Sequence, residues 1–152
     1  MKKISSFCVD HTKLEKGMYI SRIDGDITTY DIRLKKPNGG DYLDYAAVHT
    51  IEHLFATFAR NSKHGDNIVY VGPMGCRTGF YLLTKGLCDN DAIRLVYDAF
   101  CFIRDYDGEI PGNSAVECGN YSEHDLKKSK VYAKEYTEVI RDWNSSKLHY
   151  IS

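Results

Sequence analysis

The chain has 152 residues, of which 43% are hydrophobic and 27% charged, values typical of one globular domain and not of a disordered protein. Twenty Lys and Arg against 21 Asp and Glu leave a formal net charge of -1, so no strong positive field attracts nucleic acid or an anionic membrane. No apolar run is long enough to cross a bilayer or to act as a secretory signal, and we therefore expect a cytoplasmic protein.

The first half of the chain predicts two strands joined by a tight turn, followed by a helix. Residues 18–36 are rich in β-branched and aromatic side chains on both sides of the D-G-D sequence at 24–26, which favours a turn. From about Leu43 to Arg60, apolar residues recur close to the 3.6-residue period of a helix that buries one face. These apolar positions are Leu43, Ala47, Ile51, Leu54, Phe55 and Phe58.

Two further strands and a second helix are predicted next. The segments NIVYVG (67–72) and GFYLLTKG (79–86) are rich in residues that favour strands, and the irregular residues 73–78 separate them. An Asn/Asp-rich cap at 88–91 then begins a helix that continues to about Tyr106.

The last predicted helix begins near Ser122-x-x-Asp125, which can cap it, and continues to about Trp143. Its lysines are expected to form a solvated face rather than a binding stripe, and these are Lys127, Lys128, Lys130 and Lys134. The resulting order, β-β-α-β-β-α-α, lacks the regular alternation of a parallel α/β fold. We therefore predict a single α+β domain over residues 1–152, a mostly antiparallel sheet with helices packed on it.

The sequence HTIEH at 49–53 places three functional side chains on one face of the first predicted helix. Residues three and four apart are neighbours on a helix, so His49, Glu52 and His53 lie together. Two imidazoles with this spacing can bind one metal ion, and a carboxylate between them is suited to moving protons at a metal-bound group. The pattern is the H-x-x-E-H inverse of the zinc motif H-E-x-x-H.

The five cysteines are an odd number without C-x-x-C spacing, which argues against a disulfide framework and fits a reducing compartment. We expect Cys8, Cys88 and Cys101 to be buried as small hydrophobic residues. Cys76 and Cys118 instead lie beside glycines in turn-like segments, where side chains reach the surface. One of these two can be the third metal ligand, and the other an acid or base.

Two other functions are compatible with the HTIEH pattern. In a metallopeptidase of the H-x-x-E-H class, Glu52 would activate water and a downstream acidic residue such as Glu123 would be the third ligand. Such peptidases are usually much larger than this chain. In a non-enzymatic module, the metal would only stabilise the fold, and four protein ligands would close the site.

Five segments resemble the S-ribosylhomocysteine lyase (LuxS) family, whose product is the precursor of autoinducer-2. HTIEHLFATFARN, PMGCRTGFY and ECGNYSEHDL carry the closest resemblance, and SSFCVDH and YDIRLKKPN match two more family segments. They follow the family's order from Ser5 to about Asp125, which is far more specific than HTIEH alone. The resemblance implies cleavage of S-ribosylhomocysteine to homocysteine and 4,5-dihydroxy-2,3-pentanedione, by carbonyl migration along the sugar and β-elimination.

The resemblance also implies a division of roles among the candidate residues. His49, His53 and Cys118 would bind one divalent ion per subunit, natively Fe2+ and often Zn2+ or Co2+ in purified protein. Glu52 and Cys76 would be the general acid/base pair.

A homodimer is implied as well, in which the N-terminal segment of one subunit reaches the metal of its neighbour. Ser6, His11 and Arg33 match positions that hold the substrate in the family. Where this chain has Tyr70, the family commonly has an aspartate that contacts the homocysteine group, and we leave Tyr70 out of the predicted site.

Overall fold

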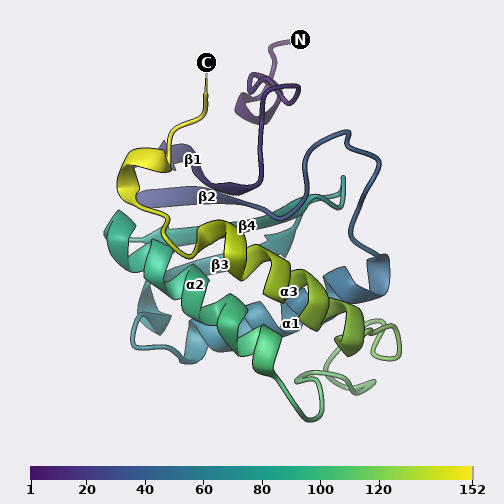
Figure 1. The fold of residues 1–152 in the computed structure, drawn as a ribbon. Coiled ribbons are helices and arrows are strands. Elements are labelled where there is room, and N and C mark those ends of the chain that lie inside the picture. The colour runs from purple at the N-terminus through teal and green to yellow at the C-terminus, as the bar shows by residue number, and fades with distance from the viewer. Residues whose placement is uncertain (152) are drawn as a thin grey trace.

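A four-stranded antiparallel sheet forms one layer of the computed structural model, which describes residues 1–151 (Figure 1). Its strands are β1 (Gly17–Asp24), β2 (Ile27–Arg33), β3 (Ile68–Pro73) and β4 (Gly79–Lys85). They lie in the order β1-β2-β4-β3, and every neighbouring pair is antiparallel. The turn between β1 and β2 falls at the predicted D-G-D sequence, where Gly25 has a φ of 63° that glycine adopts without steric cost.

Three helices form the second layer and pack against the sheet. They are α1 (Tyr45–Asn61), α2 (Asp89–Asp105) and α3 (Leu126–Ile140), and short 3-10 turns occur at η1 (Ser5–Phe7), η2 (Gly65–Asn67) and η3 (Ser145–Lys147). Figure 1 shows α2 and α3 side by side. Within residues 1–151, none of the helices has both the length and the apolar character that a membrane crossing requires. The predicted α+β fold, a mostly antiparallel sheet with helices packed on it, is confirmed.

Side chains of β2 alternate between the core and the opposite face of the sheet. Tyr30 and Ile32 are fully buried in the core between the sheet and the helices. Asp31 and Arg33 occupy the alternate positions and therefore point to the opposite face. They are also almost completely buried, because the C-terminal Tyr150 and the N-terminal segment lie against this part of the sheet. The second face of the sheet is thus a covered surface in this region.

An aromatic cluster joins the three helices. The fully buried Phe100 of α2 lies edge-on to Phe55 of α1, with ring centroids 5.2 Å apart, and edge-on to Tyr136 of α3, at 4.8 Å. These are favourable geometries for aromatic rings. Tyr136 also donates a hydrogen bond to the main-chain oxygen of Gly17 at 2.8 Å, which connects α3 to β1. The helices and the sheet therefore share one core.

The cap of α3 is Asp125 and not the predicted Ser122. The Asp125 carboxylate accepts a hydrogen bond from the main-chain nitrogen of Lys128 at 2.9 Å, as an N-cap side chain does. The helix consequently begins at Leu126, and Ser122 remains exposed in the preceding segment.

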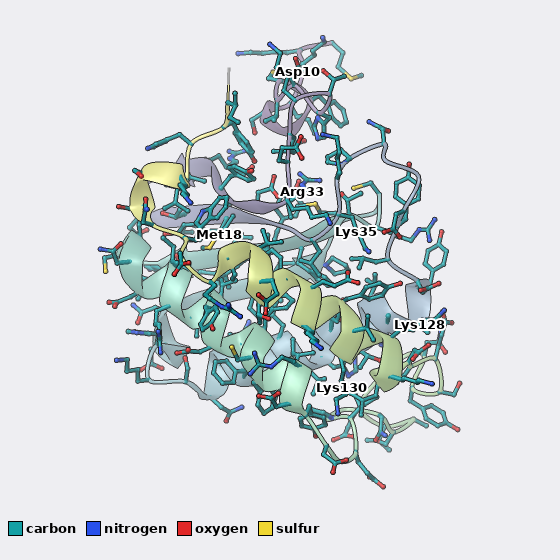
Figure 2. The ribbon with its side chains drawn as sticks, in the orientation of Figure 1. Asp10, Met18, Arg33, Lys35, Lys128 and Lys130 are labelled. Carbon is teal, nitrogen blue, oxygen red and sulfur yellow. The ribbon has the colours of Figure 1, made fainter. Side chains whose placement is uncertain are left out.

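The predicted solvated lysine face of α3 is confirmed for most of its members. Lys127, Lys128 and Lys134 are exposed, and Lys130 is partly exposed. Lys128 forms an ion pair with Asp44 at 3.3 Å, and Figure 2 shows it at the outer edge of the molecule. Exposed pairs of this kind contribute little to the stability of the fold, so these lysines mainly interact with solvent.

The prediction that Cys8 and Cys88 are buried is wrong. Both are exposed, and Cys101 is only half-buried. Cys88 precedes α2 in an extended conformation, and Cys8 follows η1 in the N-terminal segment. Neither cysteine lies in an element that packs on the core, so its low polarity alone does not bury it.

Replacing Phe100 by alanine should lower the free energy of unfolding by about 3–5 kcal/mol, because the change leaves a cavity where three helices meet. Urea-induced unfolding followed by circular dichroism measures this effect, with metal content kept equal in all samples. The control is Val131→Ala at an exposed position of α3, which should change stability by no more than about 0.5 kcal/mol. A loss below about 1 kcal/mol for Phe100→Ala would contradict the joining role of this cluster.

Candidate functional site

Three potential metal ligands converge beside α1. His49 and His53 lie one turn apart on this helix, and Cys118 comes from the long connection between α2 and α3. The Cys118 Sγ is 3.3 Å from His49 Nε2 and 3.8 Å from His53 Nε2. All three donor atoms lie within 4.8 Å of one another. The two histidines of HTIEH and one of the two candidate cysteines therefore meet in space.

Hydrogen bonds orient both imidazoles toward this point. His49 Nδ1 is 2.7 Å from the main-chain oxygen of Glu123, and His53 Nδ1 is 2.7 Å from that of Pro111. A carbonyl oxygen can only accept, so Nδ1 carries the proton in each ring and Nε2 keeps its lone pair for a ligand. Gly112 permits the approach to His53, because a Cβ at this position would lie 3.1 Å from Nδ1.

This donor set fits a divalent transition metal with an open coordination position. Imidazole nitrogens and a thiolate are usual ligands of such ions. Bonds of about 2.0–2.3 Å in a tetrahedral arrangement separate the ligand atoms by roughly 3.3–3.8 Å, which matches the distances from the Cys118 sulfur. Within residues 1–151, no fourth His, Cys, Asp or Glu joins the group. The arrangement therefore does not support the closed site of a purely structural metal module.

The acidic third ligand of the peptidase alternative is not part of this group. Glu123 offers its main-chain oxygen to His49, while its carboxylate accepts a hydrogen bond from Asn120 Nδ2 at 2.8 Å. The Glu123 carboxylate is thus held at the exposed surface, and the Cys118 sulfur, not this carboxylate, lies beside the two histidines.

Two more side chains border the three ligands. The His124 ring stacks on His49 with centroids 4.1 Å apart, and its Nδ1 is 3.0 Å from Thr50 Oγ1. Burial lowers the pKa of His124, and positive charge at the neighbouring His49 or His53 would lower it further, so the neutral form of this ring is favoured. Glu52 is half-buried on the turn of α1 that carries both ligand histidines.

A separate cavity of about 340 Å³ holds the other residues that were predicted to form the site. It is lined by Ser6 and His11 of the N-terminal segment, Arg33 at the end of β2, and Cys76 between β3 and β4. His11 Nδ1 is 2.9 Å from the main-chain oxygen of Val9, so Nδ1 donates and Nε2 remains free. One cavity thus combines a thiol, an imidazole nitrogen, a hydroxyl and a guanidinium.

A strained turn between β3 and β4 positions Cys76. The next residue, Arg77, has a φ of 60°, a left-handed conformation that is costly for a residue other than glycine. Its guanidinium donates to the main-chain oxygen of Leu43 at 3.1 Å and lies 4.5 Å from the ring centre of Tyr45. These contacts with the segment around the start of α1 offset the strain beside Cys76.

Arg33 is buried and forms an ion pair with Asp31. It is 3% exposed, and its Nε and Nη2 donate to the two carboxylate oxygens of Asp31 at 3.0 and 2.7 Å. Burial alone would lower the pKa of Arg33, but the Asp31 charge more than offsets this effect, so the pKa is raised and the guanidinium stays charged. Figure 2 shows Arg33 between the sheet and the N-terminal segment that carries Asp10.

The two groups of residues lie apart within one chain. None of the three ligands His49, His53 and Cys118 lines the cavity that contains Cys76. In Figure 1 the N-terminal segment lies at the top of the view, and the connection between α2 and α3 lies at the bottom. Within residues 1–151, a single chain therefore does not bring both groups to one point.

Tyr70 borders a neighbouring hollow and not the cavity of Cys76. This hollow of about 350 Å³ shares Ser6 and Tyr81 with the first cavity. Tyr70 is 54% exposed, and its ring covers Gly72, where a Cβ would lie 2.3 Å from a ring carbon. The hollow that Tyr70 borders therefore includes Ser6, one of the three predicted substrate residues.

Comparisons with known proteins agree with one another. The profile of a family described as S-Ribosylhomocysteinase (LuxS) matches residues 4–147. A protein of Desulfotalea psychrophila named S-ribosylhomocysteine lyase is 48% identical over an alignment of 159 positions, which covers 100% of both chains. Proteins of the same name from Finegoldia magna and Clostridium acetobutylicum are 46% and 44% identical, and each match covers 99% of both chains.

Cys118→Ala and His49→Ala should each lose bound metal, because two donors remain in place of three. Loss of an outer hydrogen-bonding partner alone costs about 10–100-fold in metal affinity, so loss of a direct ligand should cost at least as much. Metal per subunit is measured by mass spectrometry after dialysis. Cys88→Ala, at an exposed position before α2, is the control and should retain its metal. Full metal occupancy in Cys118→Ala would remove this residue from the ligand set.

Proposed function

The chain belongs to the S-ribosylhomocysteinase (LuxS) family, and on this basis we propose that it cleaves S-ribosylhomocysteine to homocysteine and 4,5-dihydroxy-2,3-pentanedione, the precursor of autoinducer-2. The convergence of His49, His53 and Cys118 in a chain that matches the family over residues 4–147 carries this proposal. The proposed carbon-sulfur lyase works in the cytoplasm, a compartment in which its free cysteines remain reduced.

A divalent ion bound by His49, His53 and Cys118 would supply a Lewis acid for the sugar carbonyl. We propose Fe2+ as the native ion, one per subunit, because the family resemblance implies it, and the donor set also fits Zn2+ or Co2+. Two neutral imidazoles and one thiolate contribute a single negative charge, so the centre as a whole remains positive toward a sugar oxygen. The two Nδ1 hydrogen bonds keep the imidazoles in the tautomer that this requires.

Glu52 and Cys76 are the proposed carriers of protons between adjacent sugar carbons. Migration of the carbonyl from C1 to C2 and then to C3 requires, at each stage, removal of a proton from one carbon and delivery of a proton to its neighbour. The carbonyl at C3 then acidifies the proton on C4, and its removal expels the homocysteine sulfur from C5. Glu52 lies beside the metal ligands and Cys76 lies in the separate cavity, which allows them to serve different sides of the sugar chain.

Ser6, His11 and Arg33 are proposed to hold the substrate, and all three line the same cavity. The Ser6 hydroxyl and the free Nε2 of His11 suit the hydroxyl groups of a sugar. Arg33 uses three of its five N–H groups, two toward Asp31 and one toward Thr78, so two remain for a ligand oxygen.

The proposed working unit is a homodimer with shared active sites. One sugar must meet both Glu52 beside the metal ligands and Cys76 in the cavity, yet these groups lie apart in a single chain. Two-fold pairing would bring the cavity of one subunit to the metal ligands of its partner and would complete two identical sites.

Anaerobically purified protein with bound Fe2+ should release one thiol for each S-ribosylhomocysteine consumed. Glu52→Gln and Cys76→Ser should keep the metal and lose at least about 100-fold in turnover, because each removes a proton carrier and leaves the ligands intact. Cys88→Ser, another exposed cysteine, is the control for Cys76 and should remain active.

Absence of thiol release from fully metallated wild-type protein would overturn the proposed function, and peptide hydrolysis in its place would favour the metallopeptidase. Near-normal turnover of Glu52→Gln or Cys76→Ser would remove only that residue from the mechanism.

Inactive His11→Ala and inactive Glu52→Ala should restore activity when they are mixed under conditions that exchange subunits. With shared sites, each mixed dimer has one site with both lesions and one with neither, so about a quarter of wild-type activity should return at equal mixing. The control mixes His11→Ala with Cys76→Ser, two lesions in the same cavity, and should remain inactive. Continued inactivity of the first mixture despite proven exchange would mean that each site lies within one subunit.

A further inference from the structure

A chain of hydrogen bonds connects Arg33 to the Cys76 thiol through the side chain of Thr78. Arg33 Nη1 donates to Thr78 Oγ1 at 2.8 Å, and the same oxygen is 3.0 Å from Cys76 Sγ. Thr78 is 1% exposed, and its main-chain oxygen accepts hydrogen bonds from the nitrogens of Leu34 and Lys35, both at 2.9 Å. Its hydroxyl is therefore held at a fixed place beside the sulfur.

We infer that Thr78 is a positioning residue for Cys76, a role that rests on the proposed acid/base function of this cysteine. The threonine oxygen accepts from Arg33 and still has its own proton, which it can donate to a thiolate. When Cys76 is protonated, the second lone pair of the same oxygen can accept from the thiol. Thr78 thus supplies a partner in both protonation states, as a group that alternates between acid and base requires.

The neighbours of Thr78 set the direction of this hydrogen bond. A guanidinium has no acceptor, so Arg33 can only donate to Oγ1, and the hydroxyl proton is left free to point toward Cys76. Asp31 holds the guanidinium through both carboxylate oxygens, and Tyr150 donates to the same carboxylate at 2.8 Å. The charge on Arg33 polarises the Thr78 hydroxyl, which strengthens its bond to a thiolate.

Thr78→Val removes the hydroxyl and nearly preserves the shape of the side chain, whereas Thr78→Ser keeps the hydroxyl. Alkylation of Cys76 by iodoacetamide in the metal-loaded protein is followed by peptide mass spectrometry, which separates this residue from the other cysteines. Only the thiolate reacts, and Thr78→Val removes the hydroxyl that donates a hydrogen bond to it. Alkylation should therefore slow roughly tenfold near pH 7. The rates should converge near about pH 10, where thiols are ionised, and Thr78→Ser should follow the wild type.

An unchanged rate in Thr78→Val, or an equal slowing at every pH, would overturn the inference, because a purely structural role gives one of these results. Thr84→Val makes the same change at the far end of β4 and should leave the Cys76 profile unchanged. If Thr78→Val fails to fold, Thr78→Ala, which also lacks the hydroxyl, replaces it, and a rate equal to that of the wild type at every pH contradicts the inference. Alkylation needs no turnover, so its result is independent of the lyase assay.

Discussion

The arrangement of the three candidate metal ligands depends on two hydrogen bonds that hold the connection between α2 and α3 against α1. The Nδ1 atoms of His49 and His53 donate to the main-chain oxygens of Glu123 and Pro111, which lie on either side of Cys118 in the sequence. One pair of contacts therefore selects the tautomer of each ring, directs both Nε2 atoms to a common point and brings the sulfur to the same point. Main-chain acceptors suit this task because their positions follow the path of the chain and involve no rotatable side chain.

On the second face of the sheet, a buried ion pair between Asp31 and Arg33 fixes side chains in a similar way. Taking two charges out of water is costly, and the cost is offset only when the geometry is good and the remaining donors find partners. Asp31 and Arg33 meet these conditions through two direct bonds, with Tyr150 as an additional donor and Thr78 as an additional acceptor. A rigid cation consequently stands beside Cys76, where a solvated arginine would move freely.

Local sequence patterns predict much of the fold and the part of the candidate site that lies on α1. The features that they do not predict depend on contacts between residues far apart in the sequence. The 3.6-residue period predicted α1 and placed His49, Glu52 and His53 together, and the order of elements predicted the α+β class. No local pattern indicates the role of Thr78, because its partner Arg33 lies 45 residues earlier and meets it only across paired strands. Every residue has a main-chain oxygen, so no sequence pattern indicates which of these oxygens accept hydrogen bonds from His49 and His53. The cap of α3 lies at Asp125 and not at Ser122 because contacts with α1 hold residues 123 and 124 outside the helix, a tertiary effect that overrides the local signal at Ser122.

The connection between α2 and α3 is long and lacks regular secondary structure, which has a consequence for how the ion is exchanged. Segments of this kind open locally at a lower free energy than that of global unfolding. Opening would withdraw Cys118 and leave the two histidines on an intact helix, because α1 is held by the core and not by the connection. Exchange of a bound ion would therefore require only that this connection opens, and the sheet and the three helices would stay folded.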